Sequence, residues 1–148
     1  MFNSSTFRAI ALSAAFGIVA SGAFAEQCST PLPNDLLVPS PHASEGAAAL
    51  LGKWGNAKWN KVLCHTLVVE SLPTDTTAST VYSWGIFEKW GVKMPGYVRV
   101  VGVFREGTLY LEFPSPQERA EYRLVDGRMH GKYFSKAGVS TIVMERQP

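Results

Sequence analysis

From Leu50 to the C-terminus, apolar and polar side chains alternate at every second residue, in short segments separated by turn-forming residues. Residues 108–113 show the pattern well, because one set of alternate side chains is apolar and the other is polar or amphipathic. The apolar set is Leu109, Leu111 and Phe113, and the opposite set is Thr108, Tyr110 and Glu112. Successive side chains of a strand point to opposite faces, so this period indicates half-buried β-strands. Such segments, rich in β-branched and aromatic residues, predict an all-β domain.

We expect about eight strands in this region, joined by short connections. Their approximate ranges are 50–58, 61–71, 78–88, 97–105, 108–113, 119–125, 128–134 and 138–146. Glu106-Gly107 and Asp126-Gly127 have the residue types of tight two-residue hairpins, so each joins two adjacent antiparallel strands. Prolines 114 and 116 mark a further turn between these hairpins. Strands that pair with their sequence neighbours form a meander.

About eight antiparallel strands in sequence order, each apolar on one side, bury those sides most simply by closing into an up-and-down barrel. A sandwich of two β-sheets is the alternative architecture. The sequence shows no long helical pattern, although residues 44–49 favour one helical turn before the strands. The β-barrel domain is therefore expected to span residues 50–148.

Residues 1–25 have the organisation of a cleavable secretory signal peptide. Arg8 is the only charged residue before Glu26, and the short apolar run after it ends at Ala23-Phe24-Ala25, an A-x-A cleavage site. A membrane anchor is the alternative, but the run is rich in Ala, Ser and Gly and is shorter than the ~20 apolar residues of a spanning helix. Glu26 follows the site where a lipidated protein would have cysteine. We therefore expect a secreted or periplasmic protein with no membrane span after cleavage.

Cleavage would leave 123 of the 148 residues, which is the size of a single domain. The formal net charge of +2 would fall to +1 with the loss of Arg8. A charge so close to zero argues against partners that bind mainly through electrostatics. We therefore expect neither nucleic acid nor an anionic membrane as a partner.

A Pro-rich segment, residues 26–49, precedes the strands and is expected to form an extended N-terminal arm. Cys28 lies in this arm and Cys64 in the second expected strand. In an oxidising compartment a disulfide is the simplest use of two cysteines, and it would fix the arm to the barrel. The alternative is a nucleophile–base pair of Cys64 and His65, but neighbours on a strand point to opposite faces.

Gly52-Lys53-Trp54 forms a G-x-W motif on the first expected strand, and Arg146 ends the last one. This combination resembles the lipocalin and calycin pattern. In that family the tryptophan plugs the closed end of the barrel and the arginine lies across its ring, a cation–π contact of about 0.5–2 kcal/mol. The resemblance implies structural roles for Trp54 and Arg146.

A second, broader similarity covers nearly all of residues 50–146. It rests on the G-x-W motif, HTLVVESL, VYSWG, Pro95-Gly96-Tyr97-Val98-Arg99 and a late GKY before a last strand that ends in arginine. These motifs resemble those of small secreted bacterial β domains, which occur alone or beside hydrolase domains. Because this chain carries no hydrolase sequence, the similarity implies a module that accompanies or binds another molecule.

Common catalytic and cofactor-binding motifs are absent from the sequence, including G-x-S-x-G, H-E-x-x-H, the P-loop and the dinucleotide fingerprint. We therefore expect no cofactor and no catalytic residue of a known motif. An enzyme built from dispersed residues would use His65, His130, Glu70 or Glu121 as acid and base. The histidines show no metal-ligand spacing, so no metal site is expected.

Four aromatic residues are the candidates for ligand binding: Trp84, Trp90, Tyr97 and Tyr110. Residues 85–97 have the composition of a loop that exposes aromatic side chains, and loops on rigid scaffolds often bind ligands. Filling of the barrel core is the alternative role for most aromatic residues of the chain. For Trp90, covering the barrel mouth is the alternative.

The sequence favours three functions in decreasing order. The first is a secreted, non-catalytic protein of lipocalin-like architecture that binds a small apolar molecule or a glycan at the open end of the barrel. The second is a periplasmic protein-binding module, such as a protease inhibitor, in which the arm or a loop blocks an enzyme. The third is the enzyme with dispersed active-site residues.

Overall fold

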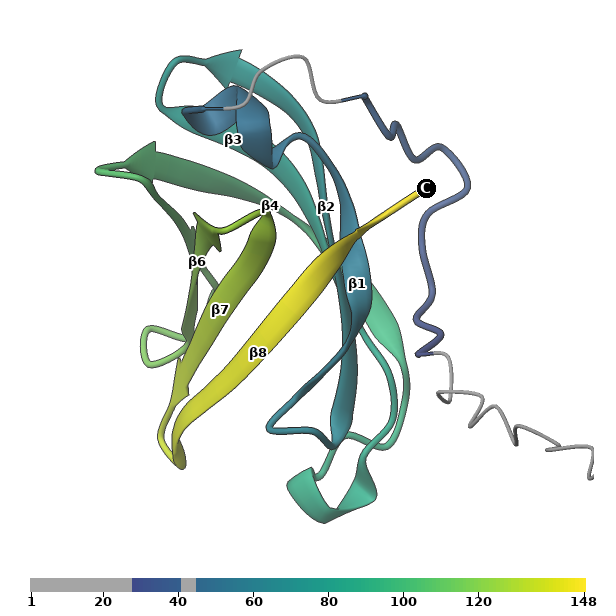
Figure 1. Cartoon of the computed structure of the whole chain (residues 1–148). Coiled ribbons are helices and arrows are strands. Elements are labelled where there is room, and N and C mark those ends of the chain that lie inside the picture. The colour runs from purple at the N-terminus through teal and green to yellow at the C-terminus, as the bar shows by residue number, and fades with distance from the viewer. Residues whose placement is uncertain (1–27, 41–44) are drawn as a thin grey trace, which may run out of the picture.

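The computed structural model describes residues 28–40 and 45–148, and the expected signal peptide lies outside the described residues. Eight antiparallel strands close into a barrel in sequence order (Figure 1). The strands are β1 (Gly52–Trp59), β2 (Leu63–Thr74), β3 (Thr77–Trp84), β4 (Gly96–Arg105), β5 (Thr108–Glu112), β6 (Arg119–Val125), β7 (Arg128–Ser135) and β8 (Gly138–Gln147). The predicted up-and-down barrel is confirmed, and the alternative two-sheet sandwich is wrong.

Two short 3₁₀ helices lie at opposite ends of the barrel, η1 (Ala47–Leu50) before β1 and η2 (Glu88–Trp90) between β3 and β4 (Figure 1). The alternation predicts a third strand over 78–88, but β3 ends at Trp84. The chain leaves the sheet there because η2 follows, and Gly91 then takes a left-handed φ of 77°. The segment between β3 and β4 therefore stands beyond the strand ends.

The two X-Gly hairpins join neighbouring antiparallel strands as predicted. Glu106 and Gly107 have φ of 50° and 74° between β4 and β5, and Asp126 and Gly127 have 50° and 76° between β6 and β7. Positive φ at both central residues is the geometry of a type I′ turn, whose twist matches that of the strands.

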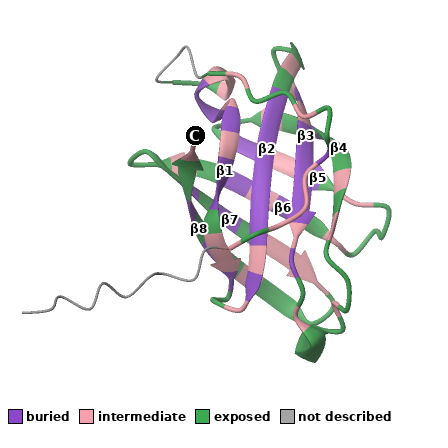
Figure 2. Cartoon of the chain, turned by 90° about the vertical axis from the view of Figure 1, so that its right-hand side faces the viewer, coloured by how far each residue is buried: buried purple, intermediate pink, exposed green. Residues whose placement is uncertain are grey.

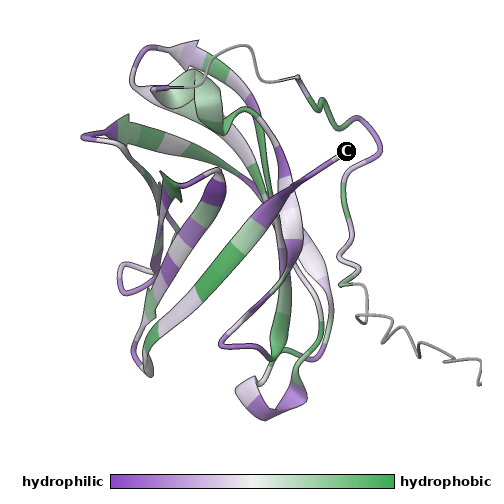
Figure 3. Cartoon of the chain, in the orientation of Figure 1, coloured by the Kyte–Doolittle hydropathy of each residue, from purple (hydrophilic) through white to green (hydrophobic). Residues whose placement is uncertain are grey.

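The inner face of the barrel is filled over most of its length. Apolar and polar residues alternate in bands along β7 (Figure 3), and the longest buried stretch of the chain lies on β2 (Figure 2). The fully buried side chains of this core include Trp54, Leu67, Val69, Leu109, Leu111, Ala120, Tyr122, Met129 and Met144. One end of the barrel is therefore closed by packed side chains.

Trp54 and Arg146 lie together at the closed end. The Arg146 guanidinium is 4.2 Å from the centroid of the Trp54 ring, and it also donates hydrogen bonds to the Ala49 and Leu51 carbonyls. The Trp54 indole N–H donates to the Leu50 carbonyl at 2.8 Å. These contacts fasten η1 across the end of the barrel.

A disulfide joins Cys28 to Cys64 of β2, as predicted. From Cys28 the described part of the arm runs along the outside of the barrel (Figure 1). The Thr30 hydroxyl donates to the Thr66 hydroxyl oxygen of β2 at 2.8 Å, and the Ser83 hydroxyl of β3 donates to the backbone of the arm. The arm is thus bound to the outer faces of β2 and β3.

An ion-pair cluster holds the arm further along. Arg99 of β4 contacts Glu70 of β2 at 3.2 Å and Asp35 of the arm at 2.9 Å, while the Leu37 N–H donates to the Glu70 carboxylate. The hydrogen bond from Arg99 lowers the pKa of Asp35, and the hydrogen bond to Glu70 raises the pKa of Arg99. The described arm therefore lies against the barrel and does not project from it.

Candidate functional site

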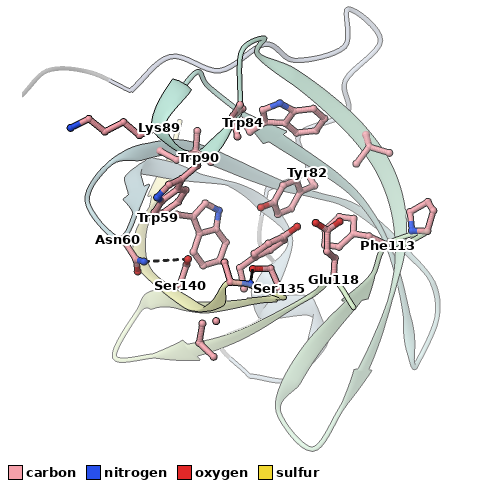
Figure 4. Close-up of a pocket in the computed structure, with 18 residues that line it drawn as sticks. Trp59, Asn60, Tyr82, Trp84, Lys89, Trp90, Phe113, Glu118, Ser135 and Ser140 are labelled. Atoms are coloured by element: carbon pink, nitrogen blue, oxygen red, sulfur yellow. Dashed lines mark hydrogen bonds between the residues drawn. The ribbon is translucent and has the colours of Figure 1, made fainter. Parts of the chain in front are cut away.

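A cavity of about 760 Å³ opens at the end of the barrel opposite η1, beside η2 (Figure 4). Its walls come from strand ends and from the segments that join them. The lining residues are Trp59, Asn60, Leu63, Tyr82, Trp84, Lys89, Trp90, Val92, Val98, Phe113, Pro114, Glu118, Tyr133, Ser135, Ala137, Gly138, Val139 and Ser140. This volume lies within the range of small-molecule binding sites, roughly 300–1,000 Å³.

Aromatic rings build the floor and one wall of the cavity. Trp59 is 2% exposed and forms part of the floor. The Tyr82 and Phe113 rings meet edge to face with centroids 5.0 Å apart, and Tyr133 lies 5.9 Å from Phe113. A flat ligand would meet ring faces and ring edges here, which favours aromatic or other apolar groups.

Two further tryptophans stand at the rim. Trp84 packs against Gly96 of β4, where an added Cβ would lie 2.6 Å from the indole ring. Its indole N–H donates to the Met94 carbonyl at 3.1 Å. Trp90 is 44% exposed, and its ring meets that of Phe87 edge to face at 5.3 Å. The rim therefore presents one fixed indole and one that solvent can reach.

Polar side chains line more than one side of the cavity: Asn60 and Ser140 lie near Trp59, and Glu118 lies across the cavity near Phe113 (Figure 4). Burial raises the pKa of Tyr133 to about 12, and the neighbouring Glu118 carboxylate acts in the same direction. Burial also holds the pKa of Tyr82 far above its ordinary value. Both phenols are therefore protonated at neutral pH and able to donate hydrogen bonds.

The Trp59 indole N–H is buried without a hydrogen-bond partner among the described residues. It is turned toward the Tyr82 hydroxyl (Figure 4). A buried donor without an acceptor is unfavourable, and most are satisfied in folded proteins. The Tyr82 hydroxyl can donate to a ligand and accept from Trp59 at the same time, because a phenol oxygen accepts whether or not its proton is donated.

His65 lies beneath the cavity floor and does not line the cavity. Its ring stacks on Trp59 at 5.1 Å, with Nδ1 2.7 Å from the Ser83 carbonyl and Nε2 2.8 Å from the Tyr122 hydroxyl. A carbonyl only accepts, so Nδ1 carries the proton and Nε2 accepts from Tyr122. Burial lowers the pKa of His65 to about 3, which keeps the imidazole neutral. Both ring nitrogens are therefore engaged in the core.

The residues that an enzyme would need are not brought together. His65 lies inside the barrel, whereas Glu70 pairs with Arg99 on the outer side of the barrel wall, where it is buried beneath the arm. His130 is exposed on β7, and Glu121 pairs with Arg119. These four side chains therefore build no acid–base pair in the cavity.

Two of the four predicted ligand-binding residues line the cavity, Trp84 and Trp90. Tyr97 and Tyr110 are not among its lining residues. Tyr97 alternates on β4 with Val98, which does line the cavity, and the Tyr110 ring lies 4.6 Å from the Arg105 guanidinium. The strand period explains this result, because adjacent residues of a strand face opposite sides.

Trp59, Phe113 and Tyr133 line the cavity but were not among the predicted site residues. Trp54 and Trp59 are five positions apart, so simple alternation would turn them to opposite faces. The pairing of β1 with β2 shifts between Trp54 and Ala57, where Asn56 has a φ of 54°. This bulge turns both tryptophans inward, and the sequence carries no clear signal for it.

No protein-family model matches this chain, and no curated protein matches it either. Within the described residues, no group of histidine, cysteine or acidic side chains could hold a metal ion. No helix of residues 28–40 and 45–148 is long and apolar enough to cross a membrane. The class that the fold and site define is a small closed β-barrel with an aromatic cavity at its open end.

Proposed function

We propose that this chain is an exported, non-catalytic binding protein that holds one small, largely apolar molecule at the open end of a lipocalin-like barrel. The observation that carries the proposal is the aromatic cavity of about 760 Å³ in a barrel that is otherwise filled. Apolar surface left facing water is unfavourable, and a ligand that covers it is stabilised.

The ligand is a flat or ring-containing molecule with at least one hydrogen-bond acceptor, such as a carbonyl group. Its body would lie against Trp59 and between the rim tryptophans, and its acceptor would meet the hydroxyls of Tyr82 and Tyr133. The rings of Trp59, Tyr82 and Phe113 favour a molecule with an apolar face, and the polar side chains of the lining offer it hydrogen bonds. The Glu118 carboxylate adds one acceptor for a ligand hydroxyl or amine.

The disulfide supports the proposed secreted or periplasmic location, because such bonds persist in oxidising compartments. The alternative of a protease inhibitor whose N-terminal arm blocks an enzyme is less well supported. Residues 28–40 are tied to the barrel by Cys28 and by the contacts of Thr30 and Asp35, so they do not stand free to enter an enzyme cleft.

Tyr133→Phe is expected to weaken binding of a neutral naphthyl ketone, 6-propionyl-2-(dimethylamino)naphthalene, by about fivefold. The loss of one hydroxyl donor removes a hydrogen bond worth about 0.5–1.5 kcal/mol net. The dissociation constant is measured by titration, because the fluorescence of this probe responds to apolar surroundings.

Tyr110→Phe is the matched control, since it removes a tyrosine hydroxyl that does not line the cavity. Its affinity for the ketone should equal that of the unmodified protein. Equal losses in the two variants, or no saturable binding below about 1 mM, would contradict the proposal, because affinities weaker than this fall below about 4 kcal/mol.

A further inference from the structure

The first half of β4 has a partner strand on one side only. β4 pairs with β3 over its residues 96–103, but with β5 only at Val103, Phe104 and Arg105. A strand whose edge is unpaired presents a row of backbone donors and acceptors to whatever lies beside it. Residues 96–102 of β4 therefore form an open edge on the side that faces β5.

The pairing of β4 with β3 shows which backbone N–H and C=O groups of β4 face the open edge. The carbonyls of Gly96 and Val100 accept hydrogen bonds from side chains of β3, so these residues point their backbone groups toward β3. In an antiparallel sheet the backbone groups of alternate residues point the opposite way. Those of Tyr97, Arg99 and Val101 therefore face the open edge. Their N–H and C=O groups have no hydrogen bond in the structure as described.

The sequence itself prevents β5 from covering this edge. The pairing of Val103 with Tyr110, continued by two steps, would set Glu112 opposite Val101 and Pro114 opposite Arg99. Proline has no N–H to donate and ends a strand within a sheet. The chain turns at Pro114-Ser115-Pro116 toward β6, and the edge of β4 stays open.

We infer that this edge binds an extended peptide segment of another protein, which adds to β4 as a further strand. Only another extended backbone matches a ladder that repeats at every second residue. On the outer face the open edge is flanked by Tyr97, Val101 and Val103, which are 45%, 67% and 44% exposed. These residues favour a peptide with β-branched or aromatic side chains at alternate positions.

A carboxylate near the open edge indicates the charge that the peptide should carry. Glu112 lies where β5 ends, and its carboxylate forms no ion pair within the described ranges. The one charge on the open part of β4, Arg99, is already neutralised by Glu70 and Asp35. The peptide that fits therefore carries lysine or arginine beside its apolar residues. This inference does not depend on a ligand in the cavity.

The probe is the acetylated and amidated heptapeptide Lys-Val-Thr-Val-Thr-Val-Lys, titrated into ¹⁵N-labelled protein and followed by NMR. Saturable shifts are expected at the amides of Tyr97, Arg99 and Val101. Two analogues carry N-methyl groups, one on the valines and the other on the threonines. One analogue should lose binding at least tenfold and the other should retain it, because only alternate N–H groups of an added strand face β4.

Val101→Pro removes one donor from the open edge without touching the β3 ladder, and it should weaken the heptapeptide about tenfold. Val101→Thr is the matched control, since it keeps the N–H and the branched side chain. A heptapeptide with glutamate in place of both lysines should bind at least fivefold more weakly. If the proline variant does not fold, the two N-methyl analogues decide.

Three results would overturn the inference. The first is no saturation by about 2 mM peptide, an affinity weaker than about 4 kcal/mol. The second is an equal effect of both N-methyl analogues, or shifts confined to the cavity residues. The third is self-association of the free protein through β4, seen by sedimentation and abolished by Val101→Pro, which would make a second copy the occupant.

Discussion

Replacing Cys28 and Cys64 together with alanine is expected to lower the free energy of unfolding by about 4 kcal/mol. The bond closes a loop with a sequence separation of 36, and its removal restores conformational freedom to the unfolded chain. The arm crosses the outer faces of β2 and β3 (Figure 2), where Val68 and Val81 are fully buried. Loosening of the arm would expose these two valines to water, which adds to the loss of stability. Urea unfolding at pH 7 measures the change in the free energy of unfolding.

Asp35→Asn is the control for the far end of the arm. This carboxylate is 77% exposed and pairs with Arg99 at 2.9 Å, and exposed ion pairs contribute little to stability. The asparagine variant should therefore unfold at nearly the same urea concentration as the unmodified protein. A similar small loss in the double cysteine variant would show that the disulfide does not stabilise the barrel.

The free energy of unfolding is expected to fall as pH is lowered from about 6.5 toward 3, because of His65. The folded protein holds this imidazole neutral with a pKa of about 3, whereas the unfolded chain takes up a proton near pH 6.5. The unfolded state thus binds more protons in this window, and acid favours it. The slope reaches about 1.4 kcal/mol per pH unit, or about 2 kcal/mol of stability lost at pH 5.

Urea unfolding at pH 7, 6 and 5 measures this slope, and two variants assign it. His65→Gln should be less stable at pH 7, since it disrupts the contacts with Ser83 and Tyr122, but it should lose the slope between pH 7 and 5. His130→Gln, on the exposed face of β7, should keep it. A slope that persists unchanged in His65→Gln would place its origin in other groups.

The fold could be predicted from the sequence because it depends on turn-forming residues and on the alternation of apolar and polar side chains. The X-Gly hairpins carry the positive φ that type I′ turns require, and strict alternation between them set the strand register. The prediction of strand ends failed where the chain leaves the sheet although the alternation continues. β3 ends at Trp84 rather than continuing to residue 88, because the chain turns out of the sheet into η2.

Only part of the candidate site could be predicted from the sequence. Trp84 and Trp90 could be selected as aromatic residues near a loop, but their partners depend on which face each strand turns inward at the open end. The bulge at Asn56 reverses that face for Trp59, and no residue pattern announces it. The unpaired edge of β4 depends on where β5 stops, which the two prolines 114 and 116 indicate only once the pairing register is known.

The four tryptophan indole N–H groups offer the most direct test of the proposed cavity, because each has a different environment. Trp59, Trp84 and Trp90 line the cavity, whereas Trp54 is fixed to Leu50 at the closed end. Two-dimensional ¹H–¹⁵N NMR during titration with the naphthyl ketone should shift the three cavity indoles along one saturation curve and leave Trp54 in place. Shifts at Trp90 alone, equal shifts at all four, or no shift would contradict a ligand site in the barrel.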